Sequence, residues 1–160
     1  VVVPSGGGGL ISGIAAALKM CRPQVAIVGV EPELANDAQL SLRRGEIVAL
    51  PIEKTRETAA DGMRATQLGD ITFRYICEYV DDIITVNEEE IRAAVHALAL
   101  DSRLVAEPSG AVSAAALFNR RHELPPAQKI AAIISGGNVD PQLLAETLSR
   151  CENEQSSSAR

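Results

Sequence analysis

Four consecutive glycines near the start of the chain are the first residues whose type and spacing suggest chemistry. They stand in the stretch VVVPSGGGGLISGIAAAL, residues 1–18, between an apolar strand-like run and a small-residue pattern typical of a helix. Glycine lets the backbone approach a ligand closely, so that several N–H groups can point the same way. The partial positive charge at the start of the following helix favours an anion. The stretch therefore predicts a phosphate-binding loop at residues 6–9.

Three kinds of phosphate site use a glycine loop, and the spacing separates them in part. A loop of the form G-x-x-x-x-G-K-[ST] is excluded, because no lysine follows the glycines at that spacing. A dinucleotide fingerprint is partly matched by Gly7, Gly9 and Ser12, with Glu31 about 20 residues on, where a ribose-binding acid would lie. A cup for the single terminal phosphate of pyridoxal 5'-phosphate (PLP) suits four successive N–H donors better. A merely flexible loop is the weakest interpretation, since four glycines cost conformational entropy.

A second glycine pair follows an apolar run near the end of the chain. The stretch IAAIISGGNVD, residues 130–140, ends its strand-like part at Ser135. In open α/β sheets, ligands bind beyond the carboxyl ends of the parallel strands. We therefore expect Ser135 on the same edge of the sheet as the glycines of residues 6–9.

Oxygen ligands gather between residues 31 and 37. Glu31 and Asp37 supply two carboxylates and Ala35 a backbone carbonyl, a set that suits Mg²⁺ or Ca²⁺ with water completing the shell. Composition alone favours a simpler interpretation. In that interpretation Glu33 and Asp37 only stabilise the start of a helix through its dipole.

The elements that position these residues alternate along the chain. Strand-like runs occupy residues 1–3, 25–30, 82–86 and 129–135. Helical patterns cover residues 10–20, 34–44, 70–79, 88–101, 109–121 and 141–150. This alternation predicts βαβ units and an α/β fold, a parallel sheet flanked by helices. The polar residues 151–160 predict a disordered tail, which leaves residues 1–150 as the folded part.

Three helix starts carry recognisable caps. Asn87 with a glutamate three residues later predicts a capping box for the helix at 88–101. Asp140 before Pro141 predicts an N-cap and a first helical position. Ser109 is the expected N-cap of the helix that follows it.

Composition and charge exclude several classes of protein. The formal net charge of -6 argues against a nucleic-acid surface, and no apolar run approaches the roughly 20 residues of a membrane span. With 160 residues and 46% hydrophobic side chains, the chain can bury one core. Cys21, Cys77 and Cys151 lack any C-x-x-C spacing, which argues against a disulfide framework or a zinc site. We expect a soluble protein of the reducing cytoplasm, with Cys77 in the core.

Six motifs, in this order, resemble the fold-type II PLP enzymes, specifically the threonine/serine dehydratase and serine racemase family. They are PSGGGGL, VEPELANDAQLS, TAADGMRATQLGDITF, VDDIITVNEEEI, AEPSGA and SGGNVD. The resemblance runs from residue 1 to about residue 150. It implies part of the large PLP-binding domain of the tryptophan synthase β-like fold, namely its C-terminal portion.

The resemblance implies a role for each candidate residue. It places the cofactor phosphate on Gly6, Gly7, Gly8, Gly9 and Leu10. It sets Ser135 opposite the pyridine nitrogen, where a neutral hydroxyl leaves the ring a weaker electron sink than a carboxylate would. It puts Glu107 close to the ring, although an acid at that position also favours a helix start. Metal-dependent members of the family match at Glu31, Ala35 and Asp37, which implies Mg²⁺ or Ca²⁺ there.

The lysine that this chemistry requires has no match in the chain. The chemistry needs an amine that forms a Schiff base and later moves the α-proton, and the chain contains only Lys19, Lys54 and Lys129. Lys19 lies about 15 Å along a helix from the phosphate, and Lys129 begins a strand whose other end meets the ligand. Lys54 lies in a charged loop, where nothing would desolvate its amine. We therefore expect a C-terminal portion of an enzyme, with an exposed sheet edge and no activity alone.

The resemblance implies an ammonia-lyase that converts a β-hydroxy amino acid, threonine or serine, into a 2-oxo acid and ammonia. The complete enzyme would be a homodimer, with an N-terminal half that this chain lacks. Serine racemase and 3-hydroxyaspartate dehydratase are alternatives within the family. A dinucleotide-binding fragment or a non-catalytic fragment is the alternative from another class.

Overall fold

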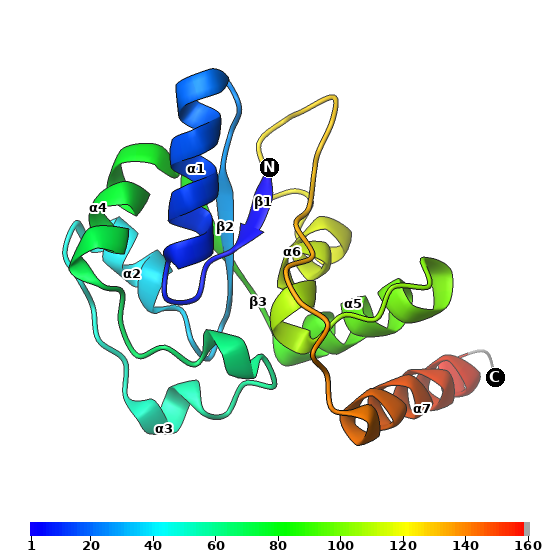
Figure 1. Ribbon diagram of the computed structural model, residues 1–160. Coiled ribbons are helices and arrows are strands. Elements are labelled where there is room, and N and C mark those ends of the chain that lie inside the picture. Colours follow the sequence, from blue (N-terminus) through cyan, green and yellow to red (C-terminus); the bar gives the residue numbers. More distant parts are fainter. Residues whose placement is uncertain (159–160) are drawn as a thin grey trace.

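The fold is a small parallel sheet with helices on both faces (Figure 1). The computed structural model describes residues 1–158. Along the chain, the elements are β1 (Val2–Pro4), α1 (Gly9–Cys21), β2 (Val28–Pro32), α2 (Asp37–Arg44), α3 (Ile52–Thr55), the 3₁₀ helix η1 (Asp61–Met63), α4 (Asp70–Tyr79), β3 (Asp82–Val86), α5 (Glu88–Asp101), α6 (Pro108–Asn119) and α7 (Pro141–Ser158). The α/β fold and the parallel sheet expected from the sequence are confirmed.

The sheet has the order β1-β2-β3, and each neighbouring pair is parallel. Val2 pairs with Val28, and Val28 in turn pairs with Asp82. All three strands therefore end at the same edge of the sheet. This places the glycine loop, which follows β1, at the edge where ligands bind in open α/β sheets.

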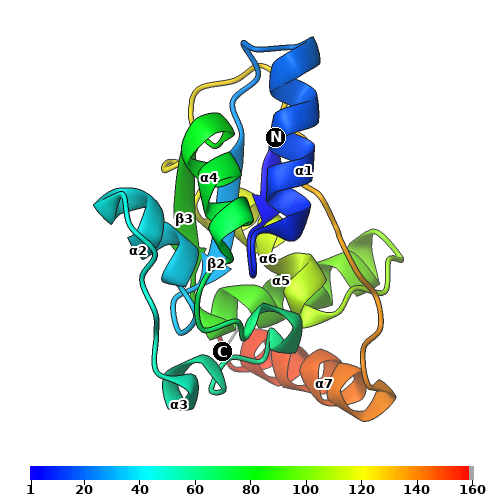
Figure 2. The same ribbon diagram turned by 60° about the vertical axis from the view of Figure 1, so that its left-hand side comes forward.

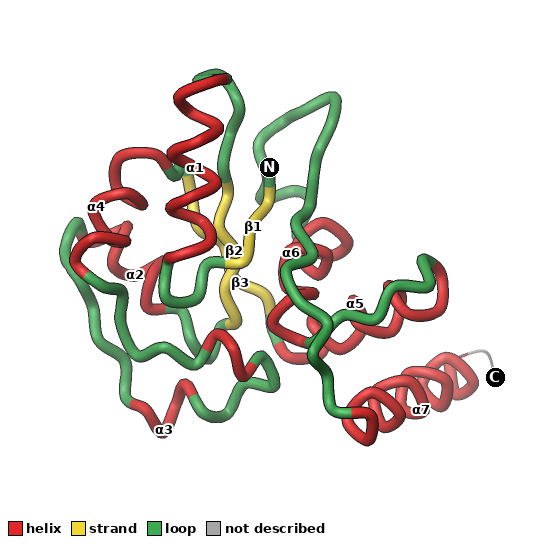
Figure 3. Tube along the Cα trace, in the orientation of Figure 1, coloured by secondary structure: helices red, strands yellow, loops and turns green. Residues whose placement is uncertain are grey.

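The predicted fourth strand at residues 129–135 is reduced to one parallel bridge. Val2 N donates to Ala131 O at 2.8 Å, and Ile133 N donates to Val2 O at 2.9 Å, so that Val2 pairs with Ala132. Figure 3 draws this segment as a loop beside β1. β1 ends at Pro4, which has no N–H to donate, and this limits the ladder that the segment can form.

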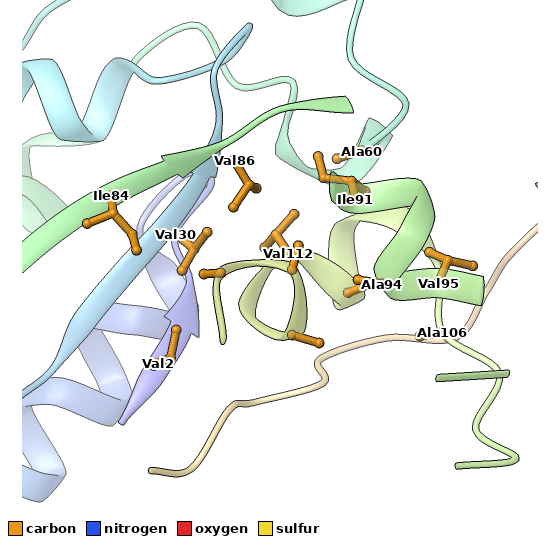
Figure 4. Packing of buried hydrophobic residues seen from close by; sticks show 14 of the residues in the cluster. Val2, Val30, Ala60, Ile84, Val86, Ile91, Ala94, Val95, Ala106 and Val112 are labelled. Carbon is orange, nitrogen blue, oxygen red and sulfur yellow. The ribbon is translucent and has the colours of Figure 1, made fainter. Parts of the chain in front are cut away.

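Two hydrophobic clusters cover the two faces of the sheet, because successive strand residues point to opposite sides. On one face Val2 joins Val30 and Ile84, packed against α5 and α6 (Figure 4). On the other face Val3 joins Ile83, beside α1, α2 and α4. Figures 1 and 2 show these two groups of helices on opposite sides of the strands. The sheet edge is thus held rigidly from both sides.

The caps at Asn87 and Asp140 are confirmed. Asn87 Oδ1 accepts from Glu90 N, and Glu90 Oε2 accepts from Asn87 N, both at 2.9 Å. Asp140 Oδ1 accepts from the N–H of Gln142 at 2.8 Å. The cap expected at Ser109 is wrong: α6 begins one residue earlier, at Pro108, whose fixed φ suits the first helical position.

Other predicted boundaries also shift. The helix predicted at 70–79 is α4, with the same bounds, but α3 and η1 carried no clear signal in the sequence. Helix α7 extends to Ser158 and so includes residues 151–158, where the sequence predicts a disordered tail. Residues 159–160 of the predicted tail lie outside the described residues. Cys77 is exposed and not in the core, because α4 buries the neighbouring Ile76 instead.

Within residues 1–158, we find no helix with the length and apolar character that crossing a membrane requires.

Candidate functional site

The glycine loop is a tight turn that leads from β1 directly into α1. Ser5 N donates to Val30 O and thereby extends the sheet, and Gly8 N donates back to Ser5 O, both at 3.0 Å. Gly6 and Gly8 have φ of 51° and 86°, left-handed values that favour glycine. α1 starts at Gly9, with no side-chain cap from the described residues and no acidic residue in its first turn. The free N–H groups at this helix start therefore suit an anion.

An open cavity of about 460 Å³ lies against this loop. Six of the seven residues predicted to contact the cofactor line it: Gly6, Gly7, Gly9, Leu10, Glu107 and Ser135. The seventh, Gly8, lies outside the cavity wall. A Cβ on Gly8 would lie 2.8 Å from the Cβ of Thr72, so this glycine allows the loop to approach α4. Residues far apart in sequence thus meet at one edge of the sheet.

Close backbone contacts bring Ser135 beside Glu107. Glu107 N donates to Gly136 O at 3.1 Å. A Cβ on Gly136 would lie 2.4 Å from Glu107 Oε1, and a Cβ on Gly110 would lie 2.4 Å from Gly136 O. Ser113 Oγ also donates to the carbonyl of Ile133. The clash at Gly110 would be with the backbone of Gly136, so the segment that carries Ser135 lies this close to α6 because position 110 is glycine.

A further wall of the cavity comes from η1, which the sequence analysis did not assign to the site. Gly62 N donates to Ser109 Oγ at 2.9 Å, and Ser109 Oγ also lies 3.4 Å from Asp61 Oδ1. Gly62 and Ser109 both line the cavity. The signal for these residues was present in the motifs TAADGM and AEPSGA, which were used for the resemblance and not for the site.

The described cavity wall contains a single charged side chain, Glu107, and neither lysine nor arginine. The described residues of this chain therefore offer an anion at the glycine loop only neutral donors. The wall offers the backbone N–H groups at the start of α1 and the hydroxyls of Ser5, Ser109 and Ser135.

None of the three lysines of the chain, all within the described residues, lines this cavity. Lys19 Nζ contacts both carboxylate oxygens of Asp81, at 2.9 and 2.8 Å. Lys129 lines a smaller cavity of about 250 Å³, which Val1 and Ala26 also line, at the amino ends of the strands. Lys54 lies on α3. The absence of a Schiff-base lysine from this chain stays a prediction.

The three candidate metal ligands are fully buried at the end of β2 and the start of α2. Glu31 Oε2 accepts from Gln39 N at 2.8 Å and Oε1 from Ala38 N at 3.3 Å, so Glu31 caps α2. Asp37 has no hydrogen-bond partner for either carboxylate oxygen among the described residues. The described residues contain no group of three or more His, Cys, Asp or Glu side chains that could hold a metal.

Burial and proximity shift the protonation of this acidic pair. Burial raises the pKa of Asp37 to about 7. Burial, and then the nearby Asp37, raise the pKa of Glu31 well above its ordinary value. The dinucleotide interpretation needed Glu31 to bind a ribose. That interpretation is wrong for this residue, because the carboxylate is buried away from the cavity and bound to backbone N–H groups.

Comparison with known proteins agrees with this geometry. A family model described as pyridoxal-phosphate dependent enzyme matches residues 1–136. The L-threonine ammonia-lyase of Thermotoga maritima is 40% identical over 150 residues, which are 94% of this chain and 36% of that protein. The L-threo-3-hydroxyaspartate ammonia-lyase of Saccharomyces cerevisiae is 42% identical over 151 residues, which are 94% of this chain and 45% of that protein.

Solved structures give the same relationship. Maize serine racemase superposes with a TM-score of 0.82 at 38% identity, covering 93% of this chain and 47% of the racemase chain. The chain therefore spans less than half the length of each of these three relatives. Since the family model covers most of its residues, and the glycine loop and Ser135 meet at one cavity, the chain belongs to the pyridoxal-phosphate dependent enzymes.

Proposed function

We propose that this chain supplies the phosphate and ring contacts of an ammonia-lyase acting on a β-hydroxy amino acid, threonine or serine. The complete protein would release a 2-oxo acid and ammonia, and it would be a homodimer. One observation carries the proposal: the glycine loop, Glu107 and Ser135 line a single cavity at the carboxyl ends of the parallel strands.

Different residues of the cavity would contact the phosphate and the ring of PLP. The N–H groups of Gly6, Gly7, Gly9 and Leu10 would bind the phosphate dianion, helped by the partial charge at the start of α1, whereas the Gly8 N–H donates to Ser5 O. The Ser135 hydroxyl would contact the pyridine nitrogen, and Glu107 would contact the ring. When bound, PLP supplies the electron sink that makes the α-proton of the substrate acidic.

The choice of Ser135 favours elimination. A carboxylate opposite the ring nitrogen would hold a proton there, whereas a hydroxyl is neutral and leaves that nitrogen largely unprotonated. With this neutral hydroxyl, bound PLP would be a weaker electron sink, which would favour loss of the β-substituent over transamination. Serine racemase is the second candidate, because the superposition with maize serine racemase covers 93% of this chain.

We further propose that the chain alone is inactive. No lysine lines the cavity, so the amine that holds the cofactor and moves the α-proton must come from a part of the protein outside this chain. The relatives are more than twice as long as the matched region, which leaves room for that part.

We also propose a structural cation, Mg²⁺ or Ca²⁺, at Glu31, Ala35 and Asp37. The buried Asp37 carboxylate without a hydrogen-bond partner supports it, since a buried charge needs a counter-charge or a proton.

A chimera tests the proposed activity. Residues 1–150 replace the matching region of the Thermotoga maritima L-threonine ammonia-lyase, and 2-oxo acid formation is measured with threonine, serine and 3-hydroxyaspartate. Conversion of L-serine to D-serine is followed in parallel. The chimera should release 2-oxo acid from threonine or serine. A folded chimera that binds PLP but only racemises serine would contradict the lyase assignment and favour serine racemase.

A further inference from the structure

Ser5 is a cavity residue to which neither the sequence nor the family resemblance assigned a role. It stands between β1 and the glycine loop and lines the same cavity as Gly6, Gly7 and Gly9. Its side chain is well over nine-tenths buried, with a residue exposure of 5%. Its Oγ has no hydrogen-bond partner among the described residues. A buried hydroxyl without a partner costs free energy, and a ligand oxygen would supply that partner.

The backbone of Ser5 is held in place although its hydroxyl is unpaired. Its N–H donates to Val30 O, and its carbonyl accepts from Gly8 N, both at 3.0 Å. These two bonds fix the residue at the base of the turn that presents the loop N–H groups. The residue is therefore fixed next to those groups, and its buried hydroxyl would have to rotate to reach a ligand bound there.

The other two hydroxyls of the cavity, those of Ser109 and Ser135, differ from that of Ser5 in their partners or position. Ser109 Oγ accepts from Gly62 N at 2.9 Å. Ser135 is carried by the segment on the opposite side of β1 from β2. With no lysine or arginine in the described wall, a phosphate dianion at the loop needs neutral donors. Among the cavity hydroxyls, Ser5 is the one that directly adjoins the glycine run.

We propose that the Ser5 hydroxyl donates a hydrogen bond to the phosphate of the ligand, adding a side-chain donor to the backbone N–H groups of the glycine loop. This inference rests on the proposed function, and it assigns Ser5 as a phosphate-binding residue of that same site. A hydrogen bond to a charged group is stronger than a neutral one, so its loss has a measurable effect on affinity.

Equilibrium dialysis of the 160-residue chain tests the proposal, with PLP, pyridoxal and inorganic phosphate as probes. Ser5→Ala should raise the Kd for PLP and for phosphate about tenfold, the effect of losing one charge-assisted hydrogen bond. The Kd for pyridoxal, which lacks the phosphate, should not change. Ser5→Thr keeps the hydroxyl and should bind PLP within about twofold of the wild type.

Two further variants provide a replacement for Ser5→Ala and a control outside the cavity. Ser5→Val also removes the hydroxyl but fills the space, so it replaces Ser5→Ala if that variant does not fold. Ser41→Ala removes a buried hydroxyl on α2, outside the cavity, and should leave all three Kd values unchanged. Thermal unfolding verifies that each variant is folded.

The outcomes separate this inference from the proposed function. If the wild-type chain binds PLP and the folded hydroxyl-free variants bind it equally well, Ser5 is not a phosphate ligand, while the proposed site stands. If those variants weaken PLP and pyridoxal alike, the hydroxyl shapes the cavity and does not contact the phosphate. If the wild-type chain binds neither PLP nor phosphate, both proposals are wrong.

Discussion

At the scale of single residues, the buried pair Glu31 and Asp37 behaves differently from the residues of the cavity. Glu31 has partners for both oxygens, whereas Asp37 has none among the described residues. Burial therefore raises the pKa of Asp37 to about 7, so that the side chain changes charge near neutral pH. The fold must then bind either a proton or a cation at this position.

The pH dependence of stability should report Asp37. Because its pKa is raised in the folded state, the stabilisation from the protonated acid is complete below pH 4 and is lost as the pH rises through about 7. Asp37→Asn keeps the shape without the charge. In EDTA at pH 8, Asp37→Asn should unfold at a higher urea concentration than the wild type. Its free energy of unfolding should be larger by at most about 4 kcal/mol, and this difference should shrink as the pH falls towards 4.5.

The same variant separates the proton from the metal. Mg²⁺ or Ca²⁺ should restore wild-type stability at pH 8 and have no effect on Asp37→Asn. Glu33→Gln, which removes an exposed carboxylate beside the site, should follow the wild type at every pH. Equal stability of Asp37→Asn and wild type from pH 4.5 to pH 8 would contradict a raised pKa at Asp37.

At the scale of elements, the junction of β1 and α1 depends on glycine at some positions and not at others. Gly8 combines a φ of 86° with a Cβ position 2.8 Å from Thr72. Gly13, in the middle of α1, has open space where a Cβ would lie. A side chain at position 8 would therefore strain the turn, whereas a methyl group at position 13 would meet no neighbour.

Gly8→Ala and Gly13→Ala should therefore change stability in opposite directions. Gly8→Ala should destabilise the chain by about 1–3 kcal/mol through backbone strain and the clash with α4. Gly13→Ala should stabilise it by up to about 1 kcal/mol, because alanine is the better helix former. Urea unfolding measures both, and PLP dialysis should show weaker binding for Gly8→Ala alone. Destabilisation by both variants would contradict this prediction, because it would mean that packing of α1, and not the turn alone, requires glycine in this segment.

At the scale of the whole molecule, the cavity exists because two distant parts of the chain meet across β1. The glycine loop belongs to the first turn of the fold, and Ser135 belongs to a segment that forms a single bridge with Val2. The contact of Gly136 with Glu107 and Gly110 holds that segment against α6. Ser135 therefore keeps its place through contacts of its segment with both β1 and α6.

Gly136→Ala tests the contact between the segment that carries Ser135 and α6. Its Cβ would meet Glu107 Oε1 at 2.4 Å, so either the Glu107 side chain must rotate away or the segment must shift from α6 and carry Ser135 with it. We expect a lower thermal midpoint and PLP binding weakened by about tenfold or more, with the Kd for inorganic phosphate nearly unchanged because the glycine loop is intact. Asn138→Ala, at an exposed position two residues on, serves as the control. Unchanged PLP binding in a folded Gly136→Ala chain would contradict a dependence of PLP binding on the contact between Gly136 and Glu107.

The sequence predicted most elements because their signals are local. The capping box at Asn87, the cap at Asp140 and the helix at 70–79 depend on residues within one or two turns, and the structure agrees with them. Local pattern failed where another part of the chain decides. The run at 129–135 has strand propensity, but its partner β1 ends at a proline.

By itself, the sequence determined the kinds of chemistry available to this protein: a glycine run for an anion, no suitably placed lysine, and a family motif set from residue 1 to about 150. Only the tertiary structure decided which residues share a cavity. In the structure, Ser5, Gly62 and Ser109 line the cavity. Gly8 lies against α4, and the buried Glu31 caps α2. The physical reason is range. Backbone conformation and capping follow from neighbours in sequence, whereas burial, hydrogen-bond pairing and the approach of two backbones depend on segments that only the fold brings together.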